Sequence, residues 1–163
     1  MGRTLSVASL SLAVLWVWGG ASACGSGGAT APPAPSLLQV GGQYQVAVAL
    51  AENDCGSVEV TPQPTSVSHA PGSGDFSLTH GANTYAGHVA ADGRFTTDVL
   101  RLGDADGSTL SVGIQGRFTT AGLEALVDVS VERPASRPPG QAPRCHYVVR
   151  WTGTKLGAPN VIP

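Results

Sequence analysis

Apolar and polar residues alternate along most of the chain from Gln43 onward. The alternation is clearest in four segments, Gln43–Ala51, Thr109–Phe118, Leu123–Glu132 and Arg144–Thr154. Successive side chains of a β-strand point to opposite faces of the sheet, so a period of two is typical of strands with one buried face. No segment beyond the N-terminal apolar run shows a helical period of any length. The pattern therefore predicts an all-β domain.

Four weaker alternating segments bring the expected number of strands to eight. They are Ser57–Thr61, Asp75–His80, Thr84–Ala90 and Phe95–Leu102, and the irregular stretch Pro62–Gly74 holds a further short candidate at Thr65–His69. Short turns separate most of them, and Asp92-Gly93 is a strong hairpin signal. These spacings predict an antiparallel up-and-down meander. The apolar phase of its strands predicts one shared interior, built from Val112, Ile114, Val127, Val129, Tyr147, Val149 and Trp151.

An apolar N-terminal run ends in small residues before Cys24. Leu5–Trp18 is mostly apolar, and Arg3 is the one charged residue before it. The run is shorter than the roughly 20 apolar residues that span a membrane, and its parts are those of a secretory signal. The sequence Ala21-Ser22-Ala23-Cys24 resembles the lipobox of bacterial lipoproteins. That resemblance implies cleavage before Cys24 by signal peptidase II and acylation of Cys24, for example with palmitate.

The residues after Cys24 predict a tether. Gly25–Pro35 contains only Gly, Ser, Ala, Thr and Pro, a composition of flexible linkers. The expected organisation is a signal peptide at 1–23, a lipid-anchored tether at 24–35 and a single β-domain at 36–163. Since no Asp follows Cys24, the resemblance implies anchoring at the outer membrane of the cell envelope. In the alternative, Ala21 and Ala23 satisfy the rule for signal peptidase I, which would release a soluble secreted or periplasmic protein.

The cysteines connect this interpretation to the fold. If Cys24 carries lipid, Cys55 and Cys145 remain as a pair in an oxidising compartment. Cys55 follows the first strand and Cys145 opens the last, and these ends are neighbours when a meander closes on itself. We therefore expect a Cys55–Cys145 disulfide and a closed or nearly closed eight-stranded barrel, which also leaves no edge strand. A two-sheet β-sandwich remains the alternative.

The expected barrel loosely resembles the lipocalin and streptavidin plan. The phrases Asp92–Thr96 and Gly116–Thr119 are similar to phrases found in small bacterial β-lipoproteins, and Tyr44 stands where lipocalins carry the Trp of a Gly-x-Trp motif. Such barrels often hold apolar ligands in their interior. Tyr44, Tyr85, Tyr147 and Trp151 are the aromatic candidates for lining a cavity, although at this domain size they commonly fill the core.

Composition and motif searches exclude several function classes. Charged residues make up 12% of the chain and the formal net charge is −2, so no basic surface for nucleic acid is expected. His69, His80, His88 and His146 lack the spacing of a zinc site. A calcium loop that began at Asp104 would need an acidic residue at its twelfth position, where Gln115 stands. We therefore expect no metal, no cofactor and no catalytic residues.

Two classes of function remain after these exclusions. The first is a membrane-anchored envelope lipoprotein with a non-enzymatic β-domain that binds an apolar small ligand or another envelope protein. The second is a secreted enzyme or enzyme inhibitor on a disulfide-locked β-barrel. A filled interior would argue against carriage of a small ligand, whereas a deep cavity with convergent polar groups would keep both binding and catalysis open.

Overall fold

The computed structural model describes residues 36–163, and the regular structure in this range consists of β-strands. Within this range no helix has the length and hydropathy to cross a membrane. The strands are β1 (Gly42–Asn53), β2 (Thr65–His69), β3 (Asp75–His80), β4 (Asn83–Val89), β5 (Arg94–Thr97), β6 (Leu100–Gly103), β7 (Thr109–Thr119), β8 (Gly122–Glu132) and β9 (Arg144–Leu156).

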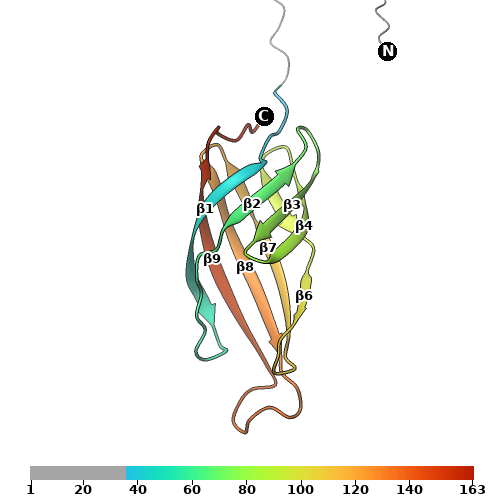
Figure 1. Cartoon of the computed structure of the whole chain (residues 1–163), viewed down its shortest axis with the longest axis vertical. Helices are drawn as coiled ribbons and strands as arrows, with labels where there is room; N and C mark the ends of the chain where they lie inside the picture. The colour runs from blue at the N-terminus through green and yellow to red at the C-terminus, as the bar shows by residue number, and fades with distance from the viewer. Residues whose placement is uncertain (1–35) are drawn as a thin grey trace, which may run out of the picture. The chain divides into compact units, whose positions relative to one another are not determined.

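The strands form one antiparallel sheet that closes into a barrel (Figure 1). Their order is β5-β4-β3-β2-β1-β9-β8-β7-β6, and β5 also pairs with β7, which completes the ring. Because β5 and β6 pair with successive parts of β7, the nine strands occupy the eight positions of an up-and-down barrel. The first and last strands pair directly, from Gln43↔Leu156 to Asn53↔Tyr147. The barrel prediction is confirmed, and the chain does not form the alternative sandwich.

Two of the predicted strands differ from the structure. Ser57–Thr61 is not a strand, and the position beside β1 belongs instead to Thr65–His69. Val60 still packs on the core, so its alternation reflects burial without a hydrogen-bonded ladder, and the nearby prolines Pro62 and Pro64 lack the N–H that a ladder needs. Phe95–Leu102 is interrupted at Asp98-Val99. At this break the Thr97 hydroxyl accepts a hydrogen bond of 3.0 Å from the backbone N–H of Ile114.

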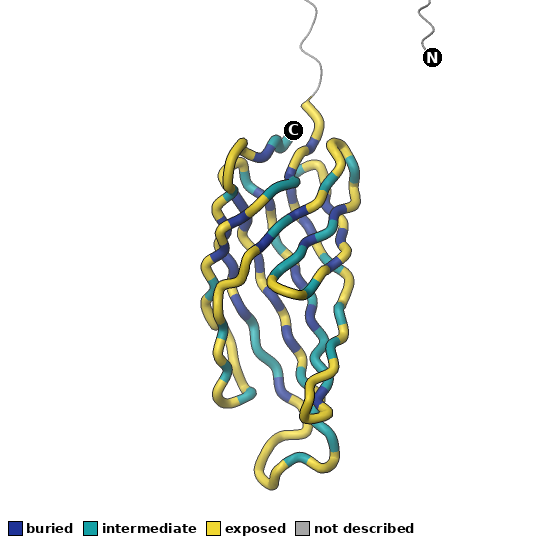
Figure 2. The backbone as a smooth tube through the Cα atoms, viewed as in Figure 1, coloured by how far each residue is buried: buried dark blue, intermediate teal, exposed yellow. Residues whose placement is uncertain are grey.

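The interior of the barrel contains the predicted apolar residues. Six of the seven are buried and Tyr147 is half-buried, so the alternation assigned the inward face of β7, β8 and β9 correctly (Figure 2). One end of the barrel is filled by aromatic rings. Phe118 is fully buried there, and its ring centroid lies 4.6 Å from that of Phe95, 5.7 Å from Phe76 and 6.0 Å from Tyr44. Packing of this kind leaves no room for a ligand at that end.

Candidate ligand-binding hollow

The strands of the barrel differ greatly in length, and this difference opens one half of it. β1, β7, β8 and β9 have 11 to 13 residues, whereas β2, β3, β4 and β5 have four to seven. β2 pairs only with Gly42–Tyr44 of β1, so the rest of that edge of β1 has no strand beside it within the described residues. The short strands therefore enclose only one end of the barrel, and the other end is a curved wall of β1, β9, β8, β7 and β6 (Figure 1).

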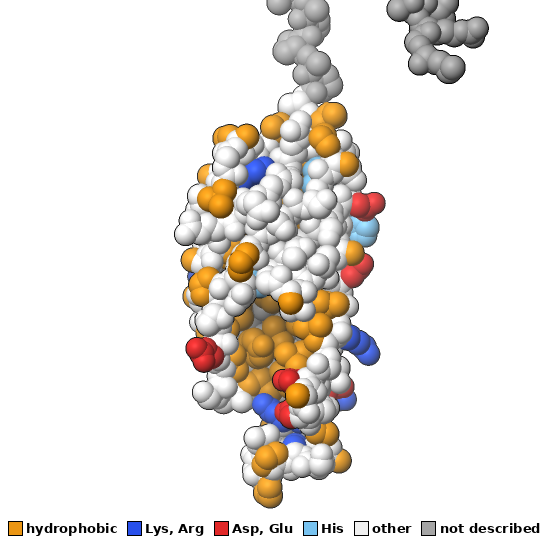
Figure 3. Space-filling model, in the orientation of Figure 1, with side chains coloured by type: hydrophobic (Ala, Val, Ile, Leu, Met, Phe, Trp, Pro, Cys, Tyr) orange, Lys and Arg blue, Asp and Glu red, His pale blue; other side chains and the backbone are white. Residues whose placement is uncertain are grey.

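The inner face of this wall is apolar. One cross-strand row joins Leu100, Val112, Val129 and Tyr147, and the next row joins Leu102, Leu110, Val131 and Cys145. Figure 3 shows a hollow in this half of the molecule whose floor consists of hydrophobic side chains. We call it the apolar hollow and define it by the half-buried residues that line it, namely Val48, Val60, Leu100, Leu102, Leu110, Val131 and Tyr147.

Four polar-tipped side chains lie on inward strand positions where the apolar hollow meets the filled half. They are His80, Tyr85, Tyr147 and Trp151, which we call the polar cluster. The His80 ring lies 4.2 Å from the Trp151 ring, and its Nδ1 is 2.7 Å from the Thr65 hydroxyl. Burial lowers the pKa of His80 and raises the pKa of Tyr85 and of Tyr147. At neutral pH the imidazole is therefore uncharged and both phenols keep their protons.

Tyr44, the remaining aromatic candidate, does not belong to this site. Its hydroxyl lies in the filled end, 2.5 Å from the Val40 carbonyl oxygen and 2.8 Å from Asn160 Oδ1. Burial raises the pKa of Tyr44 to about 12. Asn160 in turn donates to the carbonyl oxygens of Thr119 and Gly122, so this network fastens the C-terminal segment to the β7–β8 turn. The role of Tyr44 is structural.

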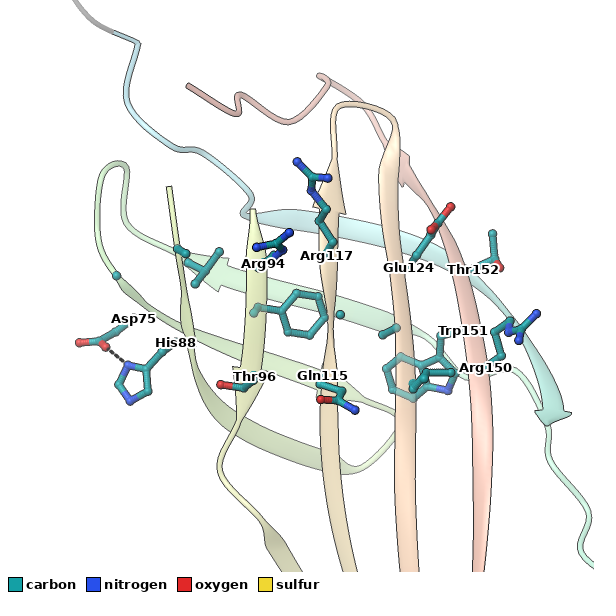
Figure 4. Close-up of a pocket in the computed structure, with 17 residues that line it drawn as sticks. Asp75, His88, Arg94, Thr96, Gln115, Arg117, Glu124, Arg150, Trp151 and Thr152 are labelled. Atoms are coloured by element: carbon teal, nitrogen blue, oxygen red, sulfur yellow. Dashed lines mark hydrogen bonds and ion pairs between the residues drawn. The ribbon is translucent and has the colours of Figure 1, made fainter. Parts of the chain in front are cut away.

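A second depression lies on the outer face of β5, β7, β8 and β9 (Figure 4). This groove has a volume of about 1240 Å³, and Arg94, Arg117, Arg150 and Glu124 are among the side chains that line it. At its rim His88 Nδ1 is hydrogen-bonded to Asp75 Oδ1 at 2.6 Å, and the side chains of Asp75 and His88 are 78% and 72% exposed. Exposed pairs of this kind contribute little energy, and the mixed charges select no particular ligand. We assign no function to this outer groove.

The structure does not unite the other candidates into a chemical site. His69 bonds to the Ser73 carbonyl oxygen, and His146 pairs with Asp128 at 2.9 Å, which raises the pKa of His146. Asp106 accepts a hydrogen bond from the Ser108 N–H, as expected for a turn rather than a calcium loop. Asp54 lies near the sulfur atoms of Cys55 and Cys145, but both sulfurs are bound in a disulfide and are not thiolate ligands.

The disulfide joins the loop after β1 to the start of β9. The Cα atoms of Cys55 and Cys145 are 5.0 Å apart, and the Asp54 N–H donates to the His146 carbonyl oxygen at 3.0 Å beside them. This is the pairing expected from the positions of the two cysteines at neighbouring strand ends. Cys24, the candidate acylation site, lies outside the described residues.

The sequence pattern did not predict the apolar hollow itself. The alternation predicted the inward residues of β7, β8 and β9, but Leu100 and Leu102 were expected in one uninterrupted strand, and His80 had no zinc-site spacing that would mark it as a site residue. The sequence feature that could have indicated the hollow is the short spacing between turns in 65–97, because it limits the length of β2, β3, β4 and β5.

Comparison of the chain with protein-family models, with curated proteins and with solved structures found no match. A functional assignment therefore has to be argued from the geometry and chemistry of the hollow. Its two distinguishing features are an accessible apolar wall and a polar cluster at one end of that wall.

Proposed function

We propose that this protein is an envelope lipoprotein whose barrel binds an elongated, largely apolar ligand in the apolar hollow, without catalysing a reaction. The observation that supports this proposal is the accessible inner wall of β6–β9. Barrel interiors are normally closed by side chains from the opposite strands, yet here Leu100, Leu102 and Leu110 on this wall are only half-buried. On the adjoining strand β1, Leu50, the ladder partner of Val149, is 38% exposed. Soluble domains rarely leave a concave apolar surface uncovered unless something binds there.

The dimensions of the wall favour a chain-like ligand. Trp151 lies six positions after Cys145 along β9, which corresponds to roughly 20 Å of strand. A ligand along this wall gains roughly 25 cal/mol for each Å² of apolar surface that it removes from water. Within the described residues, the inward positions of β6–β9 hold no Ser, Asp or Glu that would pair with His80 as a catalytic group. Binding alone is therefore the function that this wall supports best.

A charge placed on the wall is expected to prevent binding. Val131 faces the hollow and its neighbour Ser130 faces solvent, so Val131→Glu and Ser130→Glu place the same carboxylate on opposite faces of β8. We expect Val131→Glu to weaken binding of the neutral fluorescent probe N-phenylnaphthylamine by more than about tenfold, because a buried carboxylate would lose its hydration. Ser130→Glu is expected to bind the probe as the unchanged protein does. Equal binding by the two variants would contradict the proposed site.

The anchor is the second part of the proposed function. We expect Cys24→Ser to abolish incorporation of labelled palmitate and to move the protein from the detergent phase to the aqueous phase, because the thiol is the only attachment point that the lipobox-like sequence offers. The measurement is phase partition of the full chain expressed in a bacterium, with circular dichroism to verify that the β-domain remains folded. If the unchanged chain, with Cys24 intact, carries no label and stays aqueous, simple secretion replaces the lipoprotein proposal.

A further inference from the structure

The polar cluster has hydrogen-bonding groups that no protein atom satisfies. Among residues 36–163, none of the buried side-chain polar atoms lacks a hydrogen-bond partner. Four polar atoms of the cluster make no hydrogen bond to the described protein, namely the hydroxyls of Tyr85 and Tyr147, the Nε2 atom of His80 and the indole N–H of Trp151. Because every fully buried polar atom has a partner, these four atoms must be accessible to solvent or to a ligand. They belong to inward-facing side chains, of which Tyr85 and Trp151 are buried and His80 and Tyr147 are half-buried, and the space that they reach is the interior.

The hydrogen bonds around Thr65 determine which polar group His80 offers. Thr65 is 1% exposed, and its hydroxyl has a single proton, which it donates to the Gln63 carbonyl oxygen at 3.0 Å. The same oxygen is 2.7 Å from His80 Nδ1, so both contacts are hydrogen bonds only if Nδ1 carries the imidazole proton and Thr65 accepts it. The Nε2 atom of the uncharged ring is then an acceptor. The cluster therefore combines an acceptor on His80, a donor on Trp151 and two tyrosine hydroxyls that can both donate and accept.

We infer that the ligand is a neutral amphiphile with a hydroxyl group, held with that hydroxyl at the polar cluster and its apolar chain along the wall of the hollow. This inference rests on the proposed function and specifies its ligand. A hydroxyl both donates and accepts, so it can donate to His80 Nε2 while accepting from Tyr85, Tyr147 or Trp151. A pure hydrocarbon would leave these groups without partners in a space from which it excludes water, and that arrangement is unfavourable.

A carboxylate is a poorer match than a hydroxyl. On the part of the wall that lies level with Cys145–Trp151 of β9, no inward-facing position of β6, β7, β8 or β9 is occupied by Lys or Arg. Lys155 lies at the filled end, where its ammonium group bonds to Asn160 at 2.7 Å. Arg133 follows the far end of β8 and donates to the Ala142 carbonyl oxygen. A buried carboxylate at the cluster would therefore have no countercharge, and it would repel the lone pair of His80 Nε2.

Three ligands with the same chain separate this inference from the proposed function. Lauryl alcohol, laurate and dodecane are titrated into the full chain, held in amphipol, by competition with N-phenylnaphthylamine. We expect lauryl alcohol to bind at least about tenfold more tightly than laurate at neutral pH and more tightly than dodecane. If none of the three competes, the proposed function fails. If all three compete equally, the hollow binds chains but the polar cluster does not select a hydroxyl, and the inference is wrong.

Two matched substitutions test the residues of the cluster. Tyr147→Phe and Tyr85→Phe each remove one hydroxyl and keep the ring. We expect each substitution to weaken the binding of lauryl alcohol by about fivefold and to leave the affinity for dodecane unchanged. Tyr44→Phe is the control, since it removes a hydroxyl in the filled end and is expected to leave both affinities unchanged. Equal losses for alcohol and hydrocarbon in the Tyr147→Phe and Tyr85→Phe variants would mean that the rings act only by packing, which would also overturn the inference.

Discussion

Replacing both disulfide cysteines, as in Cys55→Ser/Cys145→Ser, is expected to lower the free energy of unfolding by about 4 to 5 kcal/mol without changing the barrel. The bond closes a loop across 90 positions, and in the chain-entropy model a loop of that length restricts the unfolded chain by this amount. The topology should survive because the β1–β9 ladder already joins the first and last strands from Gln43 to Asn53. Urea denaturation followed by circular dichroism measures the change.

Two results would contradict this account of the disulfide. A loss below about 1 kcal/mol would mean that the unfolded chain is already restricted without the bond. Complete loss of the β-sheet signal in the absence of urea would mean that the barrel needs covalent closure, and that the β1–β9 ladder is not sufficient. Cys24→Ser, which removes a cysteine outside the loop, serves as the control and is expected to leave the denaturation midpoint unchanged.

Phe118→Ala is expected to cost about 3 to 5 kcal/mol of stability, the usual range when a buried aromatic ring is removed from a core. Phe118 is fully buried and contacts three other aromatic rings, so the void cannot close by a small shift of one neighbour. The change is measured by urea denaturation. Because the ring lies in the filled half, the variant is also expected to bind N-phenylnaphthylamine with unchanged affinity wherever it remains folded.

The surface residue Val99 provides a comparison for this substitution. Its side chain is 63% exposed, so Val99→Ala should change stability by no more than about 0.5 kcal/mol. Phe118→Leu should recover part of the loss, since it leaves a smaller void. If Phe118→Ala and Val99→Ala have the same small effect, the aromatic cluster is not the main packing centre of the barrel.

Alternation predicted most of the fold because each long strand buries one face. The inward face of β7, β8 and β9 follows directly from residues such as Val112, Val129 and Val149, which are buried as predicted. The same signal misled at Ser57–Thr61, where Val60 is buried by docking on the core and no ladder forms. Alternation of apolar and polar residues indicates that every second side chain is buried, but it does not indicate whether the backbone is hydrogen-bonded to a neighbouring strand.

The candidate site was harder to predict than the fold, since it depends on where strands end. Strand ends are set by the lengths of their neighbours, which alternation within one strand does not contain. The polar cluster combines His80 and Tyr85 with Tyr147 and Trp151, residues that lie more than sixty positions further along the chain. These residues become neighbours only because the barrel closes with this particular pairing of strands. Their polar atoms without a protein partner become evident only when each hydrogen bond is assigned.

The β3–β4 hairpin forms the boundary of the apolar hollow, and its length has an evolutionary consequence. The hairpin turns at Gly81, whose positive φ of 58° suits the tight connection between His80 and Asn83. Adding two residues to each strand would extend this boundary by about 7 Å over the wall, while deleting residues would uncover more of it. Phe76, the hairpin residue that packs on Phe118, lies at the end of β3 away from this turn. Insertions and deletions at one surface turn can therefore alter the range of ligands accepted without loss of stability, so specificity and foldability can diverge independently among descendants of this chain.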